Sequence, residues 1–325
     1  MALTLLDTFR ILSSFSPQAG AMAQAPWDAY VEWAIAQGLA PLAAYNLEYR
    51  LAGAGAPESA RDRLLSVYQG SLNDNVMKLV NFKRAVDELE DGRVLLLGAA
   101  SFAESLYPHV AFRPVPDIQL WAQSDDLPRL VEFLRQSEFR GDSRVDRVRG
   151  AAAVLSDRRT EIAIFTHFLG ERVRAHEKGV FERALPVKVY GPSIFRPSHE
   201  DAILLLCLDQ AKAGYEVPMI SFVDLRELLS GASALVGSYS KPVDFERLKQ
   251  RASEWRIDRA LYTSASIVQR LFPELEGAAQ SAKPTLRAST QRLLEKWVIA
   301  KVVQLGPMRI LRGTDRWRRL LAGGS

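Results

Sequence analysis

The side chains whose types and spacing could do chemistry lie in residues 94–121, VLLLGAASFAESLYPHVAFRPVPDIQLW. Four apolar residues lead into a small-residue turn at Gly98, and a short helix-like run with the Ser101 hydroxyl follows. Arg113, two prolines and a second apolar run that carries Asp117 complete the stretch. This order predicts strand, turn, helix, loop and strand, which is the layout of a site for a small molecule or a phosphate group.

Composition sets wide bounds around this stretch. A chain of 325 residues with 48% hydrophobic and 25% charged residues is typical of a globular protein of about two domains. Cys207 lies in an apolar run and is expected to be a core residue. Because it is the single cysteine of the sequence, the chain can form neither an internal disulfide nor a thiolate metal cluster. Asp7 and Arg10 interrupt the first apolar run, so no signal peptide or membrane span is expected, and a cytoplasmic location is predicted.

Residues 1–92 are predicted to form an N-terminal helical region. Apolar residues recur at three- and four-residue spacing from Trp27 onward, and Gly38 and Pro41 mark the end of one helix and the start of another. Two further helices are expected, one at 59–80 and one at 82–89 that continues after it or bends from it, with Asp91 and Gly92 as the stop.

Residues 93–196 change to shorter apolar runs with β-strand character. An amphipathic helix is expected at 125–138, with Leu130 and Leu134 on its apolar face. Strands mixed with helices within about a hundred residues predict a compact α+β core with a small mixed sheet. The expected strands are 94–97, 117–121, 152–155, 161–165 and 187–190.

The remainder is predicted to be helical again, as a C-terminal lobe at 197–283. A helix start is expected at residues 198–201 ahead of AILLLCLDQAKAG, and further helices are expected at 221–229, 242–255 and 258–271. Residues 284–325 form a basic amphipathic tail that contains nine Lys and Arg residues and only two acidic residues, Glu295 and Asp315. The tail either packs on the body of the protein or contacts an acidic partner, nucleic acid or a membrane surface, where Trp297 and Trp317 would contribute.

Four segments together resemble a known family. LLLGAA, FRPVPDIQLW, EIAIFTHF and FVDLREL are similar in order and spacing to the uncharacterised nucleotidyltransferase family of the polymerase-beta-like superfamily. Members typically have Leu-Lys-Gly-Ala-Ala after the first strand, then Leu-Arg-Pro-x-x-Asp-x-Asp-Leu-Leu, then Asp-Leu-His on a later strand. The resemblance covers about residues 25–275. It implies a nucleotidyltransferase-like α+β core between an N-terminal helical region and a C-terminal helical lobe.

The family chemistry needs two divalent cations that bracket the attacking and leaving oxygens. Two aspartates at i and i+2 on one strand share a face and can bridge the ions, and a third carboxylate comes from a neighbouring strand. A small-residue turn before a helix lets backbone N–H groups approach the triphosphate. Carried over by resemblance, the turn is Gly98, Ala99 and Ala100 with Ser101, the family arginine is Arg113, the catalytic and first metal carboxylate is Asp117, and the second metal position is Gln119.

Three positions depart from the family pattern. Leu97 replaces the lysine, Gln119 replaces the second aspartate, and Phe165 stands where the third aspartate is expected, two residues before the retained His167. An amide oxygen brings no charge to a cation, so Mg²⁺ binding is expected to be weak or absent. Other carboxylates that could take part are Glu161, Asp125 and Asp126, although Asp125 and Asp126 are also typical of a helix start, and the family aspartate Asp224 could contact a ligand or pair with Arg226.

Two functions remain open for this site, beside a third in which the protein associates with nucleic acid or a membrane through its basic C-terminal segment. In the first, the chain binds an NTP or related phosphate ligand and transfers a nucleotidyl group to an unknown acceptor with Mg²⁺. In the alternative, it is a catalytically inactive descendant, a pseudoenzyme that acts as a binding or scaffolding partner in a bacterial biosynthetic pathway.

Overall fold

The computed structural model of the chain describes residues 3–18, 22–90, 92–137, 139–141, 150–231, 242–284 and 288–304. These residues divide into two compact units. The sheet unit is Ser71–Asp201, and the helical unit combines Met1–Gly70 with Ala202–Ser325. The sheet unit thus begins and ends at other residues than the core predicted at 93–196 from the sequence.

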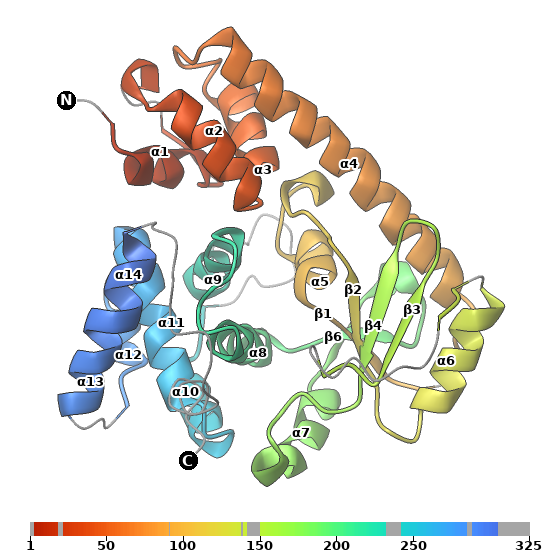
Figure 1. The fold of residues 1–325 in the computed structure, drawn as a ribbon. Coiled ribbons are helices and arrows are strands. Elements are labelled where there is room, and N and C mark those ends of the chain that lie inside the picture. The colour runs from red at the N-terminus through yellow and green to blue at the C-terminus, as the bar shows by residue number, and fades with distance from the viewer. Residues whose placement is uncertain are drawn as a thin grey trace. The chain divides into compact units, whose positions relative to one another are not determined.

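The sheet unit is built on six strands in the order β3-β4-β2-β1-β6-β5 (Figure 1). Two parallel pairs, β1 with β6 and β2 with β4, occur beside three antiparallel pairs, so the sheet is mixed. The α+β class predicted from the sequence is confirmed. The strands are β1 (Val94–Leu97), β2 (Ile118–Trp121), β3 (Ala153–Ser156), β4 (Glu161–Phe165), β5 (Leu185–Pro186) and β6 (Ile194–Arg196).

One face of this sheet carries the hydrophobic core of the unit. Leu96, Leu120, Ile162 and Ile164 point into a cluster with apolar residues of α4 (Glu58–Val86) and α6 (Leu127–Gln136). Side chains alternate between the faces of a strand, so Leu97, Gln119, Trp121, Ala163 and Phe165 belong to the other face. The helices α5 (Gly98–Ser105) and α7 (Glu177–Glu182) complete the unit.

The helical unit brings the first seventy residues together with the C-terminal helices. Phe9 packs edge-on against Trp33, with ring centroids 5.4 Å apart, and also contacts Phe272 at 5.3 Å. Arg226 stacks on the same Phe272 ring and donates to the Ser13 carbonyl at 2.6 Å. The helices are α1 (Leu5–Leu12), α2 (Trp27–Ala36), α3 (Ala40–Tyr45), α8 (His199–Lys212), α9 (Ile220–Ser230), α10 (Phe245–Glu254), α11 (Asp258–Leu271), α12 (Ala278–Ser281), α13 (Ala288–Leu294) and α14 (Ala300–Val303).

Two local predictions are wrong. Residues 187–190 form no strand, because Lys188–Tyr190 is a single 3-10 turn that leads into Gly191 at φ +86°. Residues 82–89 form no second helix, since α4 continues from Glu58 to Val86 with Asn81 inside it. Alternating apolar residues favour a strand locally, whereas the backbone at Gly191 turns the chain before a strand can pair. Among the described residues, no helix is long and apolar enough to cross a membrane.

Candidate functional site

The turn at Gly98 joins β1 directly to the first turn of α5. Gly98 has φ +58°, which glycine adopts without strain, and a Cβ at this position would lie 3.2 Å from Oε1 of Gln119. The close approach follows from strand pairing, because Leu97 is opposite Gln119 in the β1–β2 ladder. Glycine therefore allows the backbone before α5 to contact the second strand.

The N-terminus of α5 has properties of an anion site. Leu97, at its N-cap, is extended and makes no side-chain cap hydrogen bond. Ser101 in the first turn is only 3% exposed, and its Oγ makes no hydrogen bond to any described residue. Early N–H groups of a helix need partners from outside the helix, and the helix dipole favours negative charge there. The buried Ser101 hydroxyl adds a donor that the described part of the fold leaves unused.

Asp117 and Gln119 contact each other on the face of the sheet opposite the main core. Nε2 of Gln119 lies 3.4 Å from each carboxylate oxygen of Asp117, a long and therefore weak pair of hydrogen bonds. The amide thus presents its donor to the carboxylate. A carboxylate at residue 119 would instead give two negative charges that only a cation could hold together.

The register between β2 and β4 decides which carboxylate could complete this site. Gln119 pairs with Ala163, and Trp121 pairs with Phe165. Extending the ladder by one residue places Glu161 next to Asp117, on the same face. Phe165 lies four residues further along β4, about 13 Å away, in an aromatic group with Phe168. The carboxylate nearest to Asp117 on β4 is therefore Glu161, and residue 165 lies too far along the strand to hold the same ion.

The loop that carries Arg113 and leads to Asp117 is held by α4, which the sequence did not reveal. Asn75 is almost fully buried and uses its whole amide: Nδ2 donates to the carbonyls of Val110 and Arg113, at 2.7 and 2.9 Å, and Oδ1 accepts from the Val115 N–H. Lys78 donates through Nζ to the Val115 carbonyl at 2.8 Å.

The polar residues of α4 recur along one side of the helix. Ser71, four residues before Asn75, donates to the Ala111 carbonyl at 3.1 Å. The spacing 71, 75 and 78 places these side chains on one face of α4. This spacing is the only signal in the sequence for a polar face of α4 that supports the loop. It is a weak signal, because polar residues on one helix face usually lie in solvent.

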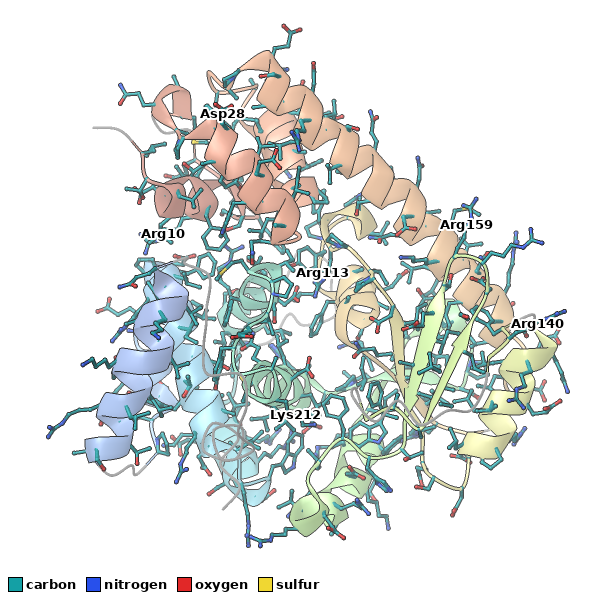
Figure 2. The ribbon with its side chains drawn as sticks, viewed as in Figure 1. Arg10, Asp28, Arg113, Arg140, Arg159 and Lys212 are labelled. Atoms are coloured by element: carbon teal, nitrogen blue, oxygen red, sulfur yellow. The ribbon has the colours of Figure 1, made fainter. Side chains whose placement is uncertain are left out.

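Arg113 extends from this loop (Figure 2) and is half-buried. Its Nη1 donates to the Pro114 carbonyl at 2.8 Å. The structure therefore brings Gly98, Gln119 and Asp117 together. The loop that carries Arg113 and leads to Asp117 is hydrogen-bonded to α4.

His167 and the aspartates before α6 lie at the other end of the sheet. β2 and β4 run parallel, Asp117 precedes β2, and His167 follows β4, so about 20 Å of strand separates His167 from the level of Asp117. Asp125 and Asp126 follow β2 and so lie toward the same far end. Asp224 is fully buried within α9, where Arg226 forms an ion pair with Glu227.

The other histidines occupy local positions. Nδ1 of His109 accepts from the Ala111 N–H at 3.3 Å, His176 ends a 3-10 turn, and His199 begins α8. In the described ranges, no three His, Cys, Asp or Glu side chains are grouped closely enough to hold a metal ion.

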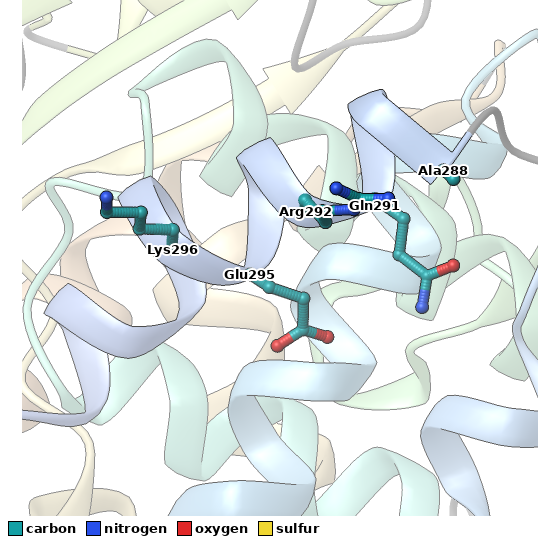
Figure 3. Close-up of a pocket in the computed structure, with 5 residues that line it drawn as sticks. All are labelled: Ala288, Gln291, Arg292, Glu295 and Lys296. Carbon is teal, nitrogen blue, oxygen red and sulfur yellow. The ribbon is translucent and has the colours of Figure 1, made fainter.

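The described part of the basic tail packs into the helical unit. Leu294, Val298 and Val302 are almost fully buried, and the tail helices contact α11. Glu295 pairs with Arg270 and accepts from the Tyr262 hydroxyl at 3.3 Å. The exposed side lines an open hollow with Ala288, Gln291, Arg292, Glu295 and Lys296 (Figure 3). Residues 285–287 and 305–325, with six of the tail arginines, Asp315 and Trp317, lie outside the described residues.

One comparison with known proteins gave a match. A family model described as uncharacterised nucleotidyltransferase matches residues 23–273. No curated protein and no solved structure gave a significant match. The match extends beyond the Gly98 turn and Asp117 into helices on both sides, and it covers well over half of the sequence. The chain therefore belongs to the uncharacterised nucleotidyltransferase family.

Proposed function

We propose that the chain binds a nucleoside triphosphate, or a related phosphate ligand, at the first turn of α5. The observation that carries the proposal is the combination at this turn of a left-handed Gly98 and a buried, unused Ser101 hydroxyl. Backbone N–H groups at a helix N-terminus bind phosphate oxygens, and glycine lets the ligand come close. Arg113 adds a guanidinium, which suits phosphate geometry. A nucleotide ligand is consistent with a cytoplasmic location.

The residues present do not fit the two-ion arrangement that the family resemblance implies. Asp117 and Gln119 are the residues that would hold Mg²⁺, but Gln119 is neutral and directs its N–H groups at Asp117. Glu161 supplies a further carboxylate by register, so the charge available suits one ion and not two. We therefore assign Mg²⁺ a weak role or none.

A second candidate is a catalytically inactive protein that keeps ligand binding and acts as a binding or scaffolding partner in a bacterial biosynthetic pathway. The amide contact between Gln119 and Asp117 favours this candidate, because it satisfies the carboxylate without a cation. Leu97 on the adjacent strand adds no charge. Transfer of a nucleotidyl group to an unknown acceptor remains the first candidate if a single ion suffices.

Titration calorimetry with the four NTPs, with and without Mg²⁺, tests the proposal. We expect the wild type to bind at least one NTP and Gly98→Ala to weaken binding by about tenfold or more, since the new Cβ meets Gln119 and strains the turn. Gly214→Ala is the matched control, because Gly214 has φ +66° but no atom within 4 Å of the added Cβ. No heat with any NTP would refute nucleotide binding.

The Asp117→Ala variant distinguishes the two candidates. Tight Mg²⁺-dependent binding that disappears in this variant supports an enzyme. Binding that is indifferent both to Mg²⁺ and to Asp117→Ala supports the inactive candidate, because the ligand is then held by α5 alone.

A further inference from the structure

Three side chains outside the nucleotide site form a chain of hydrogen bonds in the sheet unit. Oγ of Ser124 lies 3.4 Å from Nε2 of His167, and Nδ1 of His167 lies 3.0 Å from Oε2 of Glu177. They come from the loop after β2, the segment after β4 and the first turn of α7. A hydroxyl nucleophile bonded to a base, which is in turn bonded to an orienting carboxylate, is the arrangement typical of nucleophilic catalysis.

Strand pairing places the serine beside the histidine. The parallel ladder of β2 and β4 continues past Trp121, with the Ala122 N–H donating to the Phe165 carbonyl at 3.0 Å. Nε1 of Trp121 donates to the Thr166 carbonyl at 3.2 Å and fixes the residue before His167. The two segments that leave the strands therefore run next to each other.

Glu177 fixes both the orientation and the tautomer of the imidazole. Its Oε1 accepts from the backbone N–H groups of Phe168 and Leu169, at 2.8 and 2.9 Å, and its side chain is 9% exposed. A carboxylate held by two N–H groups accepts a third hydrogen bond and offers none, so His167 donates from Nδ1. Nε2 is then left with its lone pair toward the Ser124 hydroxyl, which is the arrangement of a general base.

We propose that Ser124, His167 and Glu177 form a second reactive site, at which Ser124 is acylated by activated esters. His167 is 38% exposed and Ser124 is exposed, so an acyl group can reach the hydroxyl. An open site supplies little binding energy to the transition state, which restricts the substrates to esters with good leaving groups. Asp125 and Asp126 adjoin the serine and disfavour anionic acyl groups.

The reaction balances without a cofactor. Oγ of Ser124 forms a bond to the acyl carbon while its proton passes to Nε2 of His167. The bond from carbon to the leaving oxygen breaks, and the proton on His167 leaves with the alcohol. Water, deprotonated by His167, then attacks the acyl-serine, the carboxylic acid departs, and Ser124 recovers its proton. Glu177 touches no reacting atom and is a positioning residue.

The test is the reaction of the full chain with p-nitrophenyl acetate, followed by peptide mass spectrometry. We expect an acetyl group on Ser124 in samples quenched with acid during the reaction, and release of nitrophenolate at a rate at least about a hundredfold above that of Ser124→Ala. His167→Gln should lose acetylation equally. The matched control is His176→Gln, because His176 is a partly exposed histidine one residue before Glu177 and should keep the full rate.

Glu177 is tested with a pair of variants, since it also holds two backbone N–H groups. Glu177→Gln should abolish acetylation at unchanged fold, by offering an N–H to Nδ1 and turning the lone pair away from Ser124. Glu177→Asp, which restores a carboxylate, should recover part of the rate, whereas a purely structural role would not separate the two. Acetylation of lysine or histidine alone, or a Ser124→Ala rate equal to wild type, overturns the proposal.

Discussion

Gln119 determines how much charge the site beside α5 can hold. Its Oε1 would lie 3.2 Å from a Cβ at residue 98, and its Nε2 lies 3.4 Å from a carboxylate oxygen of Asp117. The difference from a carboxylate side chain is one negative charge and a pair of N–H donors that point at Asp117. With a carboxylate at residue 119 the two side chains could bind a cation, whereas the amide of Gln119 forms a hydrogen-bonded pair with Asp117 instead.

Gln119→Asp should therefore introduce cation dependence. The substitution places a second carboxylate two residues from Asp117 and on the same face, where like charges favour a bridging cation. We expect Mg²⁺ to increase NTP affinity by about tenfold or more in this variant, measured by calorimetry. Gln123→Asp makes the same charge change at an exposed position beyond β2 and should leave the Mg²⁺ dependence as in the wild type.

Cys207 is the second residue whose chemistry its surroundings determine. The thiol is fully buried in α8, and burial raises its pKa to about 12. The unfolded chain has a thiol of ordinary pKa, so stability from this group is present below about pH 8.5 and is lost as the pH rises toward 12.

Iodoacetamide labelling measures the burial of this thiol, which is the cause of its raised pKa. We expect no alkylation of the native chain at pH 8 and full alkylation in denaturant, in parallel with the loss of circular dichroism. Labelling at the same rate in both states would show that the thiol is accessible in the folded chain.

At the scale of elements, α4 is the support for the loop that carries Arg113. Asn75 and Lys78 hold carbonyls and an N–H of residues 110–116, which have little regular structure of their own. A loop without ladder hydrogen bonds needs such partners for its buried backbone groups. The position of Asp117 thus depends on side chains about forty residues earlier.

Asn75→Ala tests this dependence. The variant loses three hydrogen bonds to the loop and should destabilise the sheet unit by about 2–4 kcal/mol, with weaker NTP binding well below its melting temperature. Asn81→Ala is the matched control, because Asn81 also lies in α4 and donates to another loop, at Asp157. Equal loss of affinity in both variants would mean that the effect is general destabilisation.

At the scale of the whole molecule, the described tail belongs to the helical unit. Leu294, Val298, Ile299 and Val302 are buried, so a chain that ends near residue 282 would lose core contacts as well as charge. A truncated chain could therefore lose binding either because it unfolds or because it lacks the surface that contacts a partner. Charge substitutions on the exposed side separate the two.

Leu294→Ala should lower the free energy of unfolding of the helical unit by about 2–5 kcal/mol, since Leu294 is fully buried. Arg292→Gln with Lys296→Gln should leave urea unfolding unchanged, because both side chains are exposed. If the tail binds polyanions, the double variant should weaken salt-sensitive binding to heparin. Unchanged stability in Leu294→Ala would contradict packing of the tail.

The sequence by itself determined the fold class, the strand–turn–helix at Gly98 and most helix positions, because these follow from local periodicity, glycine and proline. It could not determine the register. Side chains repeat every two residues along a strand, so Glu161, Ala163 and Phe165 fit one face equally well, and only the pairing of β2 with β4 places Glu161 beside Asp117. The grouping of Ser124 with His167 and the joining of residues 1–70 to the C-terminal helices were decided in the same way, by contacts between residues far apart in the chain.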